Sequence, residues 1–385
     1  MIIFVAISSF LMTLFGMPTL IKVAKLKQLV DEPGEDRKIH HRSVPTIGGV
    51  MIFISVFFNV LFWAGFIGVD ASFDASAQPM ILACLVLIFF MGLKDDIIGM
   101  SPSKKLLVHL FIGLALTTIS EYRIESFGGL FGVYELPESL SIIFSIFVYI
   151  VIVNAWNLID GLDGLAAGFT VIAMSAFTFW FLSVGAMSEA LLSIATAGTL
   201  LGFLVFNFAP ARIFMGDCGS LFVGVIGYVL ATSVIATPIE AIPDHLLLVS
   251  KEVLVMGILS YPLVDTLRVF ILRAARGISP FHPDRNHLHH RLMMQFGTHR
   301  KTAISVYAYS IAMILLAFST PYLRGILPLE ILFFGLLAIA FGTFYPTLRR
   351  TKKSYMISLL LDQPEIPKGK KKPLDGVDSK QSILA

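Results

Sequence analysis

The chain contains the stretch Ser141-Ile-Ile-Phe-Ser-Ile-Phe-Val-Tyr-Ile-Val-Ile-Val-Asn154-Ala-Trp-Asn157-Leu-Ile-Asp160-Gly-Leu-Asp163-Gly164. Its first half is almost wholly apolar, and its second half is rich in amides, carboxylates and glycine. The apolar run over 139–156 can cross a bilayer, and its backbone must be helical because lipid offers no hydrogen-bond partners. Polar groups at the end of such a helix are expensive to bury, so they usually mark function. The stretch therefore predicts a membrane helix that ends in a functional site.

The rest of the chain is similarly apolar. Hydrophobic residues make up 56% of the 385 residues, and the mean hydropathy is +0.82. This composition excludes an ordinary water-soluble protein, and no segment alternates as the strands of a membrane barrel do. We predict an all-α, polytopic integral membrane helical bundle with about eleven transmembrane helices. The predicted spans are 1–21, 46–69, 79–93, 104–120, 139–156, 164–184, 188–208, 218–237, 250–272, 302–319 and 326–346.

The charges of the loops predict the orientation. Lysine and arginine gather near 22–42, 94–105 and 273–301 and after residue 347, whereas the loops between these carry few. The positive-inside rule places the charged set in the cytosol, with the N-terminus outside and the C-terminus cytosolic. The predicted domains are a transmembrane domain over 1–346 with cytosolic catalytic loops, and a basic, disordered cytosolic tail over 347–385. Basic residues follow the first span, which favours a retained helix over a cleaved signal peptide.

Four polar clusters interrupt the apolar pattern, and all fall on the predicted cytosolic side, although their acids, amides and histidines were not used to assign it. One is the segment 154–164. The others are Lys94-Asp95-Asp96, Phe214-Met-Gly-Asp217-Cys-Gly-Ser220 and Pro283-Asp-Arg285-Asn-His287-Leu-His289-His290-Arg291. Their convergence indicates a site for a metal and phosphates that is reached from the cytosol. The two cysteines, Cys84 and Cys218, show no disulfide framework or zinc spacing, so we predict no bridge.

The acidic clusters suit a metal or a phosphate. Asp95 and Asp96 end the third predicted span, and adjacent carboxylates suit a hard metal ion or a base, unless they form only a helix end that faces water. Asn157, Asp160 and Asp163 recur every three residues, near one face of a helix. These three could hold a nucleobase, ribose hydroxyls or a metal. Capping of the next helix would explain one acid but not all three polar side chains.

Asp217 and Phe214 precede the eighth predicted span. Glycines on both sides of Asp217 would let a phosphate or Mg²⁺ approach the backbone. We predict that Asp217 binds a metal, although an acid at the start of a helix can act only as a cap. Phe214 could stack on a base or be an interfacial aromatic residue, and the sequence leaves this choice open.

The fourth cluster is dense in phosphate-binding chemistry. Arg285 with His287, His289 and His290 beside it suits a diphosphate through charge-assisted hydrogen bonds. Zinc is less favoured because a histidine pair at i,i+4 and cysteine ligands are missing. A loop that only sets topology would need arginine and lysine but not this number of histidines.

Three further features carry weaker signals. Lys105 lies close to the aspartates and is predicted to bind phosphate, where the alternative is a basic residue that only flanks a span. The group His40-His41-Arg42 could contact substrate or only turn the chain. Asp265 and Arg268, three residues apart within the ninth predicted span, are predicted to form a structural ion pair.

These motifs resemble the polyprenyl-phosphate N-acetylhexosamine-1-phosphate transferase superfamily, of the glycosyltransferase family 4 type. The resemblance runs from His40 to Arg291 and rests on the four clusters together. The form His287-Leu-His289-His290 is similar to the bacterial branch that begins O-antigen, enterobacterial common antigen or teichoic-acid linkage synthesis, and differs from the branch that serves peptidoglycan. Cys218 stands where the family more often has Ala or Thr.

The resemblance implies a reaction and a set of site residues. Undecaprenyl phosphate would attack the β-phosphorus of a UDP-N-acetylhexosamine, most simply UDP-GlcNAc, to give the lipid diphospho-sugar and UMP, with Mg²⁺ or alternatively Mn²⁺ as cofactor. The implied catalytic residues are Asp95, Asp96 and His289, and the implied metal ligands are Asp217 and Asn157. The implied substrate-binding residues are Lys105, Asp160, Asp163, Phe214, Arg285, His287 and His290.

The resemblance also implies partners and a location. The enzyme would lie in the bacterial inner (cytoplasmic) membrane with its site facing the cytosol. Its partners would be a UDP-N-acetylhexosamine, undecaprenyl phosphate and the lipid bilayer, with no nucleic acid, and self-association is left open. One alternative is the same chemistry on another UDP-N-acetylhexosamine. The other is a secondary transporter, which is disfavoured because transporter sites lie near the midplane of the membrane.

Overall fold

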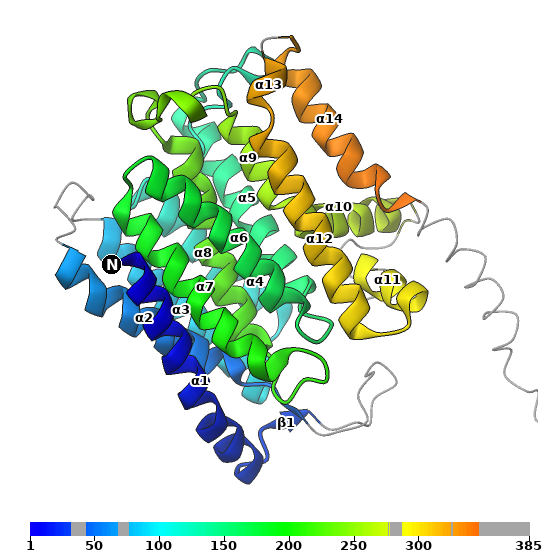
Figure 1. The fold of residues 1–385 in the computed structure, drawn as a ribbon. Helices are drawn as coiled ribbons and strands as arrows, with labels where there is room; N and C mark the ends of the chain where they lie inside the picture. Colours follow the sequence, from blue (N-terminus) through cyan, green and yellow to red (C-terminus); the bar gives the residue numbers. More distant parts are fainter. Residues whose placement is uncertain (32–43, 68–76, 276, 278–286, 325, 346–385) are drawn as a thin grey trace, which may run out of the picture.

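The computed structural model describes residues 1–31, 44–67, 77–275, 277, 287–324 and 326–345. Within these ranges the chain is a bundle of α-helices with one short pair of strands (Figure 1). The predicted tail over 347–385, the group His40-His41-Arg42 and Arg285 lie outside the described residues.

The helices follow the apolar runs of the sequence. The first eight are α1 Ile2–Leu26, α2 Gly48–Ile67, α3 Ala77–Ile98, α4 Pro102–Thr118, α5 Glu138–Leu158, α6 Leu165–Ser183, α7 Met187–Asn207 and α8 Gly216–Ala236. The others are α9 Lys251–Ile258, α10 Ser260–Ala274, α11 Leu288–Phe296, α12 His299–Phe318, α13 Pro321–Arg324 and α14 Leu329–Gly342. Strands β1 Val30–Asp31 and β2 Val44–Pro45 pair antiparallel, and short 3₁₀ turns cover Leu130–Gly132, Ile239–Ala241 and Asp244–Leu246.

The prediction of an all-α membrane protein is confirmed, and each predicted span coincides with a described helix or pair of helices. Seven described helices are long and apolar enough to cross a membrane, and the α9–α10 pair would make eight. Helix α4 has 17 residues and α14 has 14, while α3 carries Lys94, Asp95 and Asp96 near its end. The count of eleven crossings therefore stays a prediction.

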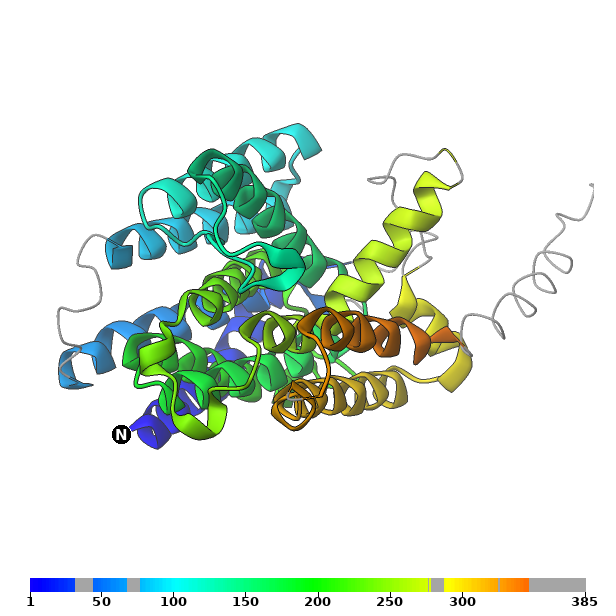
Figure 2. The same cartoon turned by 90° about the horizontal axis from the view of Figure 1, so that it is seen from above.

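The ninth predicted span, 250–272, is not one straight helix. It is broken at Leu259 into α9 and α10, which meet at an angle of 75°. Pro262 explains the break, because proline has no N–H to donate to Ile258 and its ring collides with that carbonyl. Figure 2 shows α10 (yellow-green) projecting away from the rest of the bundle.

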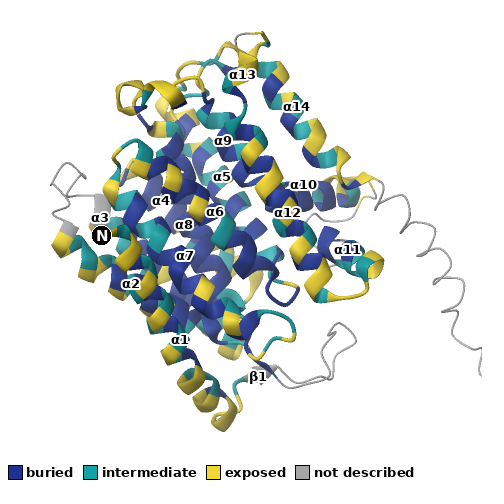
Figure 3. Ribbon diagram, in the orientation of Figure 1, coloured by how far each residue is buried: buried dark blue, intermediate teal, exposed yellow. Residues whose placement is uncertain are grey.

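Helix α8 forms the centre of the bundle. In Figure 3 it lies in the dark blue interior, and 89% of its apolar span is buried, against 22% for α1. Glycines on α8 let its neighbours approach closely: a Cβ on Gly227 would lie 2.5 Å from the Trp156 ring, and one on Gly49 of α2 would lie 2.2 Å from the backbone nitrogen of Gly219. Helix packing in a membrane depends on such contacts, because lipid removes the hydrophobic drive between helices.

Both cysteines are buried and free, so the prediction of no disulfide is confirmed. Cys218 lies at the start of α8, where a Cβ on Gly92 of α3 would be 2.5 Å from its Cα. Helices α2, α3 and α8 thus meet backbone to backbone at this end of the bundle, which is the lower end in Figure 1, near β1.

Candidate active site

Asp217 lies in the first turn of α8, and Asp96 from the end of α3 holds that turn. The backbone N–H groups of Asp217 and Cys218 donate to the two carboxylate oxygens of Asp96, at 2.8 and 3.0 Å. The start of a helix has free N–H groups and a partial positive charge, so a carboxylate placed there is stabilising. Because this carboxylate comes from another helix, it also fixes α3 against α8.

Gly216 makes this approach possible. Its φ is +71°, a left-handed conformation that glycine adopts without strain. A Cβ on Gly216 would lie 2.1 Å from the carbonyl oxygen of Thr46 and 2.7 Å from Asp96 Oδ2. The glycine before Asp217 therefore makes room for two groups of the protein itself.

Lys105, in the first turn of α4, joins two of the acids. Its amine forms a salt bridge with Asp95 and lies 3.0 Å from Asp217 Oδ2. Asn157, near the end of α5, donates from Nδ2 to Asp217 Oδ1 at 2.8 Å and to Ser220 Oγ at 2.9 Å. A lysine in the first turn of a helix opposes the helix dipole, so its pairing with carboxylates is what stabilises it there.

We call Asp95, Asp96, Lys105, Asn157 and Asp217 the carboxylate–lysine cluster. Its members come from α3, α4, α5 and α8 and were all predicted as site residues from the sequence. Ser220, one turn after Asp217, was not singled out on its own, and its contact with Asn157 could not be read from the spacing of the motif. His109, a turn after Lys105 on α4, was also missed; it is buried, with Nδ1 3.3 Å from the Tyr149 hydroxyl.

Asp160 is half-buried close to this cluster. Burial is the main cause that raises the pKa of Asp160 well above its ordinary value, and the carboxylates of Asp217 and Asp96 add to it. Each further negative charge here is unfavourable, so a bound cation would favour the ionised form of Asp160. The carboxylates of Asp217 and Asp96 thus add negative charge beside Asp160, on top of the effect of burial.

Asp163 is buried, and its carboxylate contacts other parts of the protein. Its carboxylate accepts a hydrogen bond from the N–H of Ala211 at 3.0 Å and lies 3.2 Å from His299 Nδ1. These contacts connect the turn between α5 and α6 to the loop before α8 and to α12. Asp163 therefore has a structural role, and its predicted contact with uridine stays a prediction.

Phe214 is half-buried in the loop between α7 and α8. Its backbone N–H donates to the carbonyl of Pro45, and its carbonyl accepts from the N–H of Gly48 at 2.9 Å. The loop is thus held against the start of α2. The predicted stacking of the Phe214 ring on a base is not tested by these backbone contacts.

The histidines of the fourth cluster gather around Asp265 of α10. Asp265 Oδ2 lies 3.3 Å from Nδ1 of both His287 and His289, and Asp265 Oδ1 accepts a hydrogen bond from the N–H of Leu288 at 2.6 Å. The predicted ion pair with Arg268 is present, with Nη1 3.8 Å from Asp265 Oδ1. The sequence pointed to that pair and missed the closer partners, because His287 follows Asp265 by 22 residues, a separation that no spacing rule relates to a contact.

His289 connects this group to the turn after α5. A Cβ on Gly161 would lie 2.6 Å from His289 Nε2, so the ring touches the turn that carries Asp160. His290 is half-buried, and its ring centroid lies 4.3 Å from that of His289. The second and fourth sequence clusters thus meet, as predicted.

Two sets of donors suit a cation. Asp217 and Asn157, with Asp95 nearby, offer oxygen ligands and surplus negative charge, which suit Mg²⁺ or Mn²⁺. In this structure the amine of Lys105 lies between the carboxylates of Asp95 and Asp217. The carboxylates of Asp96 and Asp217 near Asp160 fit the same conclusion.

The second set consists of Asp265, His287 and His289, whose ligand atoms all lie within 4.8 Å of one another. One oxygen and two imidazole nitrogens suit zinc or another transition metal better than Mg²⁺. The Nδ1 contacts of both histidines are also explained by hydrogen bonds to Asp265. The carboxylate–lysine cluster is therefore the better site for the predicted Mg²⁺.

The fold and the site together define a class of protein. It is a multi-pass helical membrane protein in which carboxylates from different helices face one lysine amine at the start of a buried helix. Comparison with protein families agrees with this class. The model of glycosyl transferase family 4 matches residues 78–237, a range that contains the whole carboxylate–lysine cluster.

Curated relatives cover most of the chain. A probable undecaprenyl-phosphate N-acetylglucosaminyl 1-phosphate transferase of Bacillus subtilis is 32% identical over 326 residues, 82% of this chain and 85% of that protein. A decaprenyl-phosphate N-acetylglucosaminephosphotransferase of Mycolicibacterium smegmatis is 32% identical over 71% of each chain. An undecaprenyl-phosphate alpha-N-acetylglucosaminyl 1-phosphate transferase of Escherichia coli K12 is 29% identical over 78% of each. The chain belongs to glycosyl transferase family 4, the polyprenyl-phosphate N-acetylhexosamine-1-phosphate transferases, and the predicted resemblance is confirmed.

Proposed function

We propose that this protein transfers N-acetylhexosamine 1-phosphate, most simply GlcNAc 1-phosphate, from a UDP-sugar to undecaprenyl phosphate and releases UMP. The names of its relatives in Bacillus, Mycolicibacterium and Escherichia support the reaction. The observation that carries the proposal is the meeting of Lys105, Asp95 and Asp217 at the start of α8. Phosphoryl transfer needs positioned substrates and neutralised charge more than it needs covalent chemistry.

The cluster offers both kinds of charge that this reaction needs. We assign Asp217 and Asn157 to hold Mg²⁺, or Mn²⁺ in its place; when bound, such an ion neutralises charge on the diphosphate oxygens. The amine of Lys105 donates to a phosphate oxygen of a substrate. A substrate phosphate competes with Asp95 and Asp217 for that amine, so binding exchanges one anionic partner of Lys105 for another.

The two neighbouring acids of α3 have different tasks. Both oxygens of Asp96 accept N–H groups of α8, so we assign it to the positioning of Asp217. Asp95 pairs with Lys105 and orients its amine. A lipid phosphate carries negative charge at neutral pH, so no strong base is needed to activate it, and we prefer this organising role to general base catalysis for both residues.

The histidines supply contacts for the diphosphate. A hydrogen bond to Nδ1 determines which nitrogen of an imidazole faces outward. Asp265 thus directs His289 Nε2 toward the turn at Gly161, and we assign His289 to the transferred phosphate, with Arg285, His287 and His290 around it. Asp160, Asp163 and Phe214 are assigned to the uridine side.

The proposed location follows from the charges of the loops. The active site faces the cytosol at the bacterial cytoplasmic membrane, where UDP-sugars are present. The lipid diphospho-sugar would be the first membrane intermediate of a cell-surface polysaccharide, such as an O-antigen or a teichoic-acid linkage unit. Another UDP-N-acetylhexosamine is the second candidate donor, because one contact to a sugar hydroxyl can decide the choice.

The test is release of UMP by the purified protein with undecaprenyl phosphate, Mg²⁺ and a panel of UDP-sugars. UDP-GlcNAc is expected to be the best donor, and EDTA is expected to stop the reaction. Asp217→Asn is expected to lower kcat about 100-fold to 10,000-fold, as loss of a positioned catalytic group does, and to raise the Mg²⁺ concentration needed. The control is Asp244→Asn, an exposed acid in the 3₁₀ turn Asp244–Leu246 between α8 and α9. Turnover that is indifferent to EDTA and to Asp217→Asn would contradict the metal assignment, and absence of UMP release with every donor would contradict the reaction.

A further inference from the structure

The group formed by Asp265, His287 and His289 has the chemistry of a transition-metal site. Asp265 belongs to α10, and the two histidines flank Leu288 at the start of α11. All three are buried, with exposed fractions of 1%, 6% and 1%. Two imidazole nitrogens and one carboxylate oxygen form a donor set that zinc binds well, whereas Mg²⁺ prefers oxygen ligands. None of the three belongs to the carboxylate–lysine cluster, so a metal here would be separate from the proposed Mg²⁺.

The distances between the ligand atoms fit a tetrahedral ion better than they fit hydrogen bonds. Asp265 Oδ2 lies 3.3 Å from Nδ1 of His287 and 3.3 Å from Nδ1 of His289. An N–H···O hydrogen bond spans about 2.7–3.2 Å between its heavy atoms. Zinc binds nitrogen and oxygen at about 2.0–2.2 Å, so two ligands of a tetrahedral ion lie about 3.3–3.5 Å apart. The three ligand atoms lie within 4.8 Å of one another, and small shifts of the rings would let one ion contact them all.

The two carboxylate oxygens of Asp265 have different partners. Oδ1 accepts the N–H of Leu288 at 2.6 Å and lies 3.8 Å from Arg268 Nη1. Oδ2 faces the two histidine nitrogens. A hydrogen bond to one oxygen of a carboxylate orients the other oxygen toward a metal. The protein therefore holds Oδ2 as a metal ligand requires, through contacts of Oδ1 that a bound ion would leave intact.

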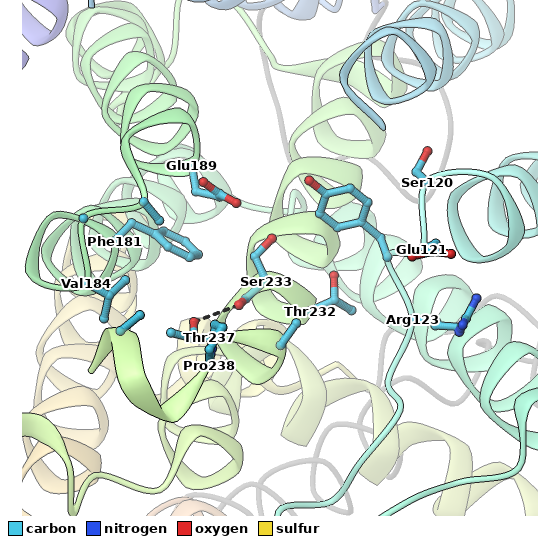
Figure 4. A pocket seen from close by; sticks show the side chains of 15 residues that line it. Ser120, Glu121, Arg123, Phe181, Val184, Glu189, Thr232, Ser233, Thr237 and Pro238 are labelled. Atoms are coloured by element: carbon cyan, nitrogen blue, oxygen red, sulfur yellow. Dashed lines mark hydrogen bonds between the residues drawn. The ribbon is translucent and has the colours of Figure 1, made fainter. Parts of the chain in front are cut away.

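The polar cavity at the end of α8 far from Asp217 offers no such donor set. It has a volume of about 370 Å³, and Figure 4 shows Glu189, Ser233 and Arg123 around it. The described residues that line it include no histidine and no cysteine. Its guanidinium already supplies positive charge and has no lone pair for a metal. Zinc therefore has better ligands at the histidines of α11 than in this cavity.

We propose that Asp265, His287 and His289 bind one Zn²⁺ ion, which fastens the start of α11 to α10. Asp265 supplies Oδ2, each neutral histidine supplies Nδ1, and a water molecule completes the tetrahedron, as in other zinc sites with three protein ligands. Coordination through Nδ1 leaves the imidazole proton on Nε2, so His289 keeps an N–H directed at the Gly161 turn. The inference concerns metal binding alone and does not depend on the proposed reaction.

The zinc content of the purified full-length protein, prepared without a histidine tag, tests the proposal. The protein is stripped with a chelator, reloaded by dialysis against a zinc salt, washed with excess Mg²⁺ and measured by inductively coupled plasma mass spectrometry. One zinc per chain is expected to remain. X-ray absorption at the zinc edge is expected to show four ligands, nitrogen and oxygen, at about 2.0–2.2 Å.

Three variants locate the ion. His287→Ala is expected to weaken zinc binding at least about 100-fold, because even the loss of a residue that only orients a metal ligand costs about 10-fold to 100-fold. His245→Ala removes an exposed histidine, and Asp217→Asn removes an acid of the carboxylate–lysine cluster. Both of these controls are expected to keep the zinc. In the wild type, zinc at about 100 times its Kd is expected to slow hydrogen exchange that requires opening of the site about 100-fold.

Three results would each overturn the proposal: removal of the zinc by Mg²⁺, equal losses in His287→Ala and His245→Ala, or loss of the zinc in Asp217→Asn. Should His287→Ala fail to fold, X-ray absorption of the wild type decides the question, because a six-coordinate shell of oxygen ligands would contradict the site without any variant. Absence of UMP release would contradict the proposed reaction and leave this expectation unchanged, since zinc binding is measured without substrate.

Discussion

Lys105 and Lys104 are adjacent in the sequence but have different surroundings. Lys104 is exposed, whereas Lys105 is half-buried between Asp95 and Asp217. Without the Lys105 amine, two carboxylates that come from different helices would face each other with no cation among their described contacts. Such like-charge contact is unfavourable in a partly buried site, so Lys105 contributes both to the assembly of the site and to substrate binding.

The substitution Lys105→Gln is expected to lower the rate of UMP release about 100-fold or more, because a positioned charge next to the reacting phosphates is lost. Lys104→Gln changes the same formal charge one residue away and is expected to act like the wild type. The measurement is kcat and KM for both substrates in both variants. Equal losses in the two variants would show that only the net charge of the loop matters.

Asp265 shows why part of the site could not be predicted at the residue scale. The i,i+3 spacing pointed to Arg268, since neighbours on a helix face are read directly from the sequence. The contacts with His287 and His289 depend on how α10 and α11 meet in space, and no spacing rule gives that. The same holds for Lys105 and Asp217, which are 112 residues apart, although a lysine in the first turn of a helix was a usable signal of an anionic partner.

Helix α11 begins with a cap that another helix supplies, as α8 does. Asp265 of α10 accepts the N–H of Leu288, as Asp96 of α3 accepts those of Asp217 and Cys218. Residues of the site therefore lie at the starts of two helices, and a carboxylate from another helix caps each start. Removal of a cap of this kind costs about 0.5–2 kcal/mol.

Asp265→Asn is expected to loosen the start of α11. Hydrogen exchange of the backbone amides of Leu288 to Arg291 should become about tenfold faster, which corresponds to a loss within that range, and UMP release should fall because His289 is no longer oriented. Asp244→Asn serves as the control for a general effect of losing one acid. Unchanged exchange in α11 would show that Asp265 does not stabilise this helix start.

The contact between α3 and α8 depends on Gly92. A Cβ at Gly92 would lie 2.5 Å from Cys218 Cα, whereas a Cβ at Gly65 of α2 would meet nothing within 4 Å. We expect Gly92→Ala to destabilise the protein by about 1–3 kcal/mol through overpacking and to displace Asp96 from α8. Gly65→Ala is expected to be neutral or slightly stabilising. Thermal unfolding in detergent compares the two, and equal melting temperatures would contradict the importance of the contact.

At the scale of the whole molecule, the sequence predicted the helices well because a long apolar run has few alternatives in lipid. The break in the ninth predicted span was missed, although Pro262 was a signal for it. Hydropathy averages over a window, so it registers composition and not the loss of one N–H group. The number of crossings depends on the short helices α4 and α14 and on the bent pair, and composition alone leaves it open.

The proposed orientation makes a prediction about labelling. Ser101 lies in the exposed connection between α3 and α4, and Tyr134, 71% exposed, lies in the loop before α5. In spheroplasts, a membrane-impermeant maleimide is expected to label a cysteine that replaces Tyr134, and to label one that replaces Ser101 only after lysis. The native cysteines are buried and add little background. Labelling of both positions in intact spheroplasts would contradict the arrangement.

The glycines of α8 separate two properties of a membrane helix. Its high hydropathy is sufficient for entry into the bilayer, and a uniform leucine helix of the same length would enter as readily. Such a helix would have no recesses at Gly219 or Gly227 for α2 and Trp156, so it would insert without docking. Insertion of α8 into the bilayer therefore depends on its apolar side chains. Its docking against α2 and Trp156 depends on the glycines, which have no side chain to hold these neighbours away.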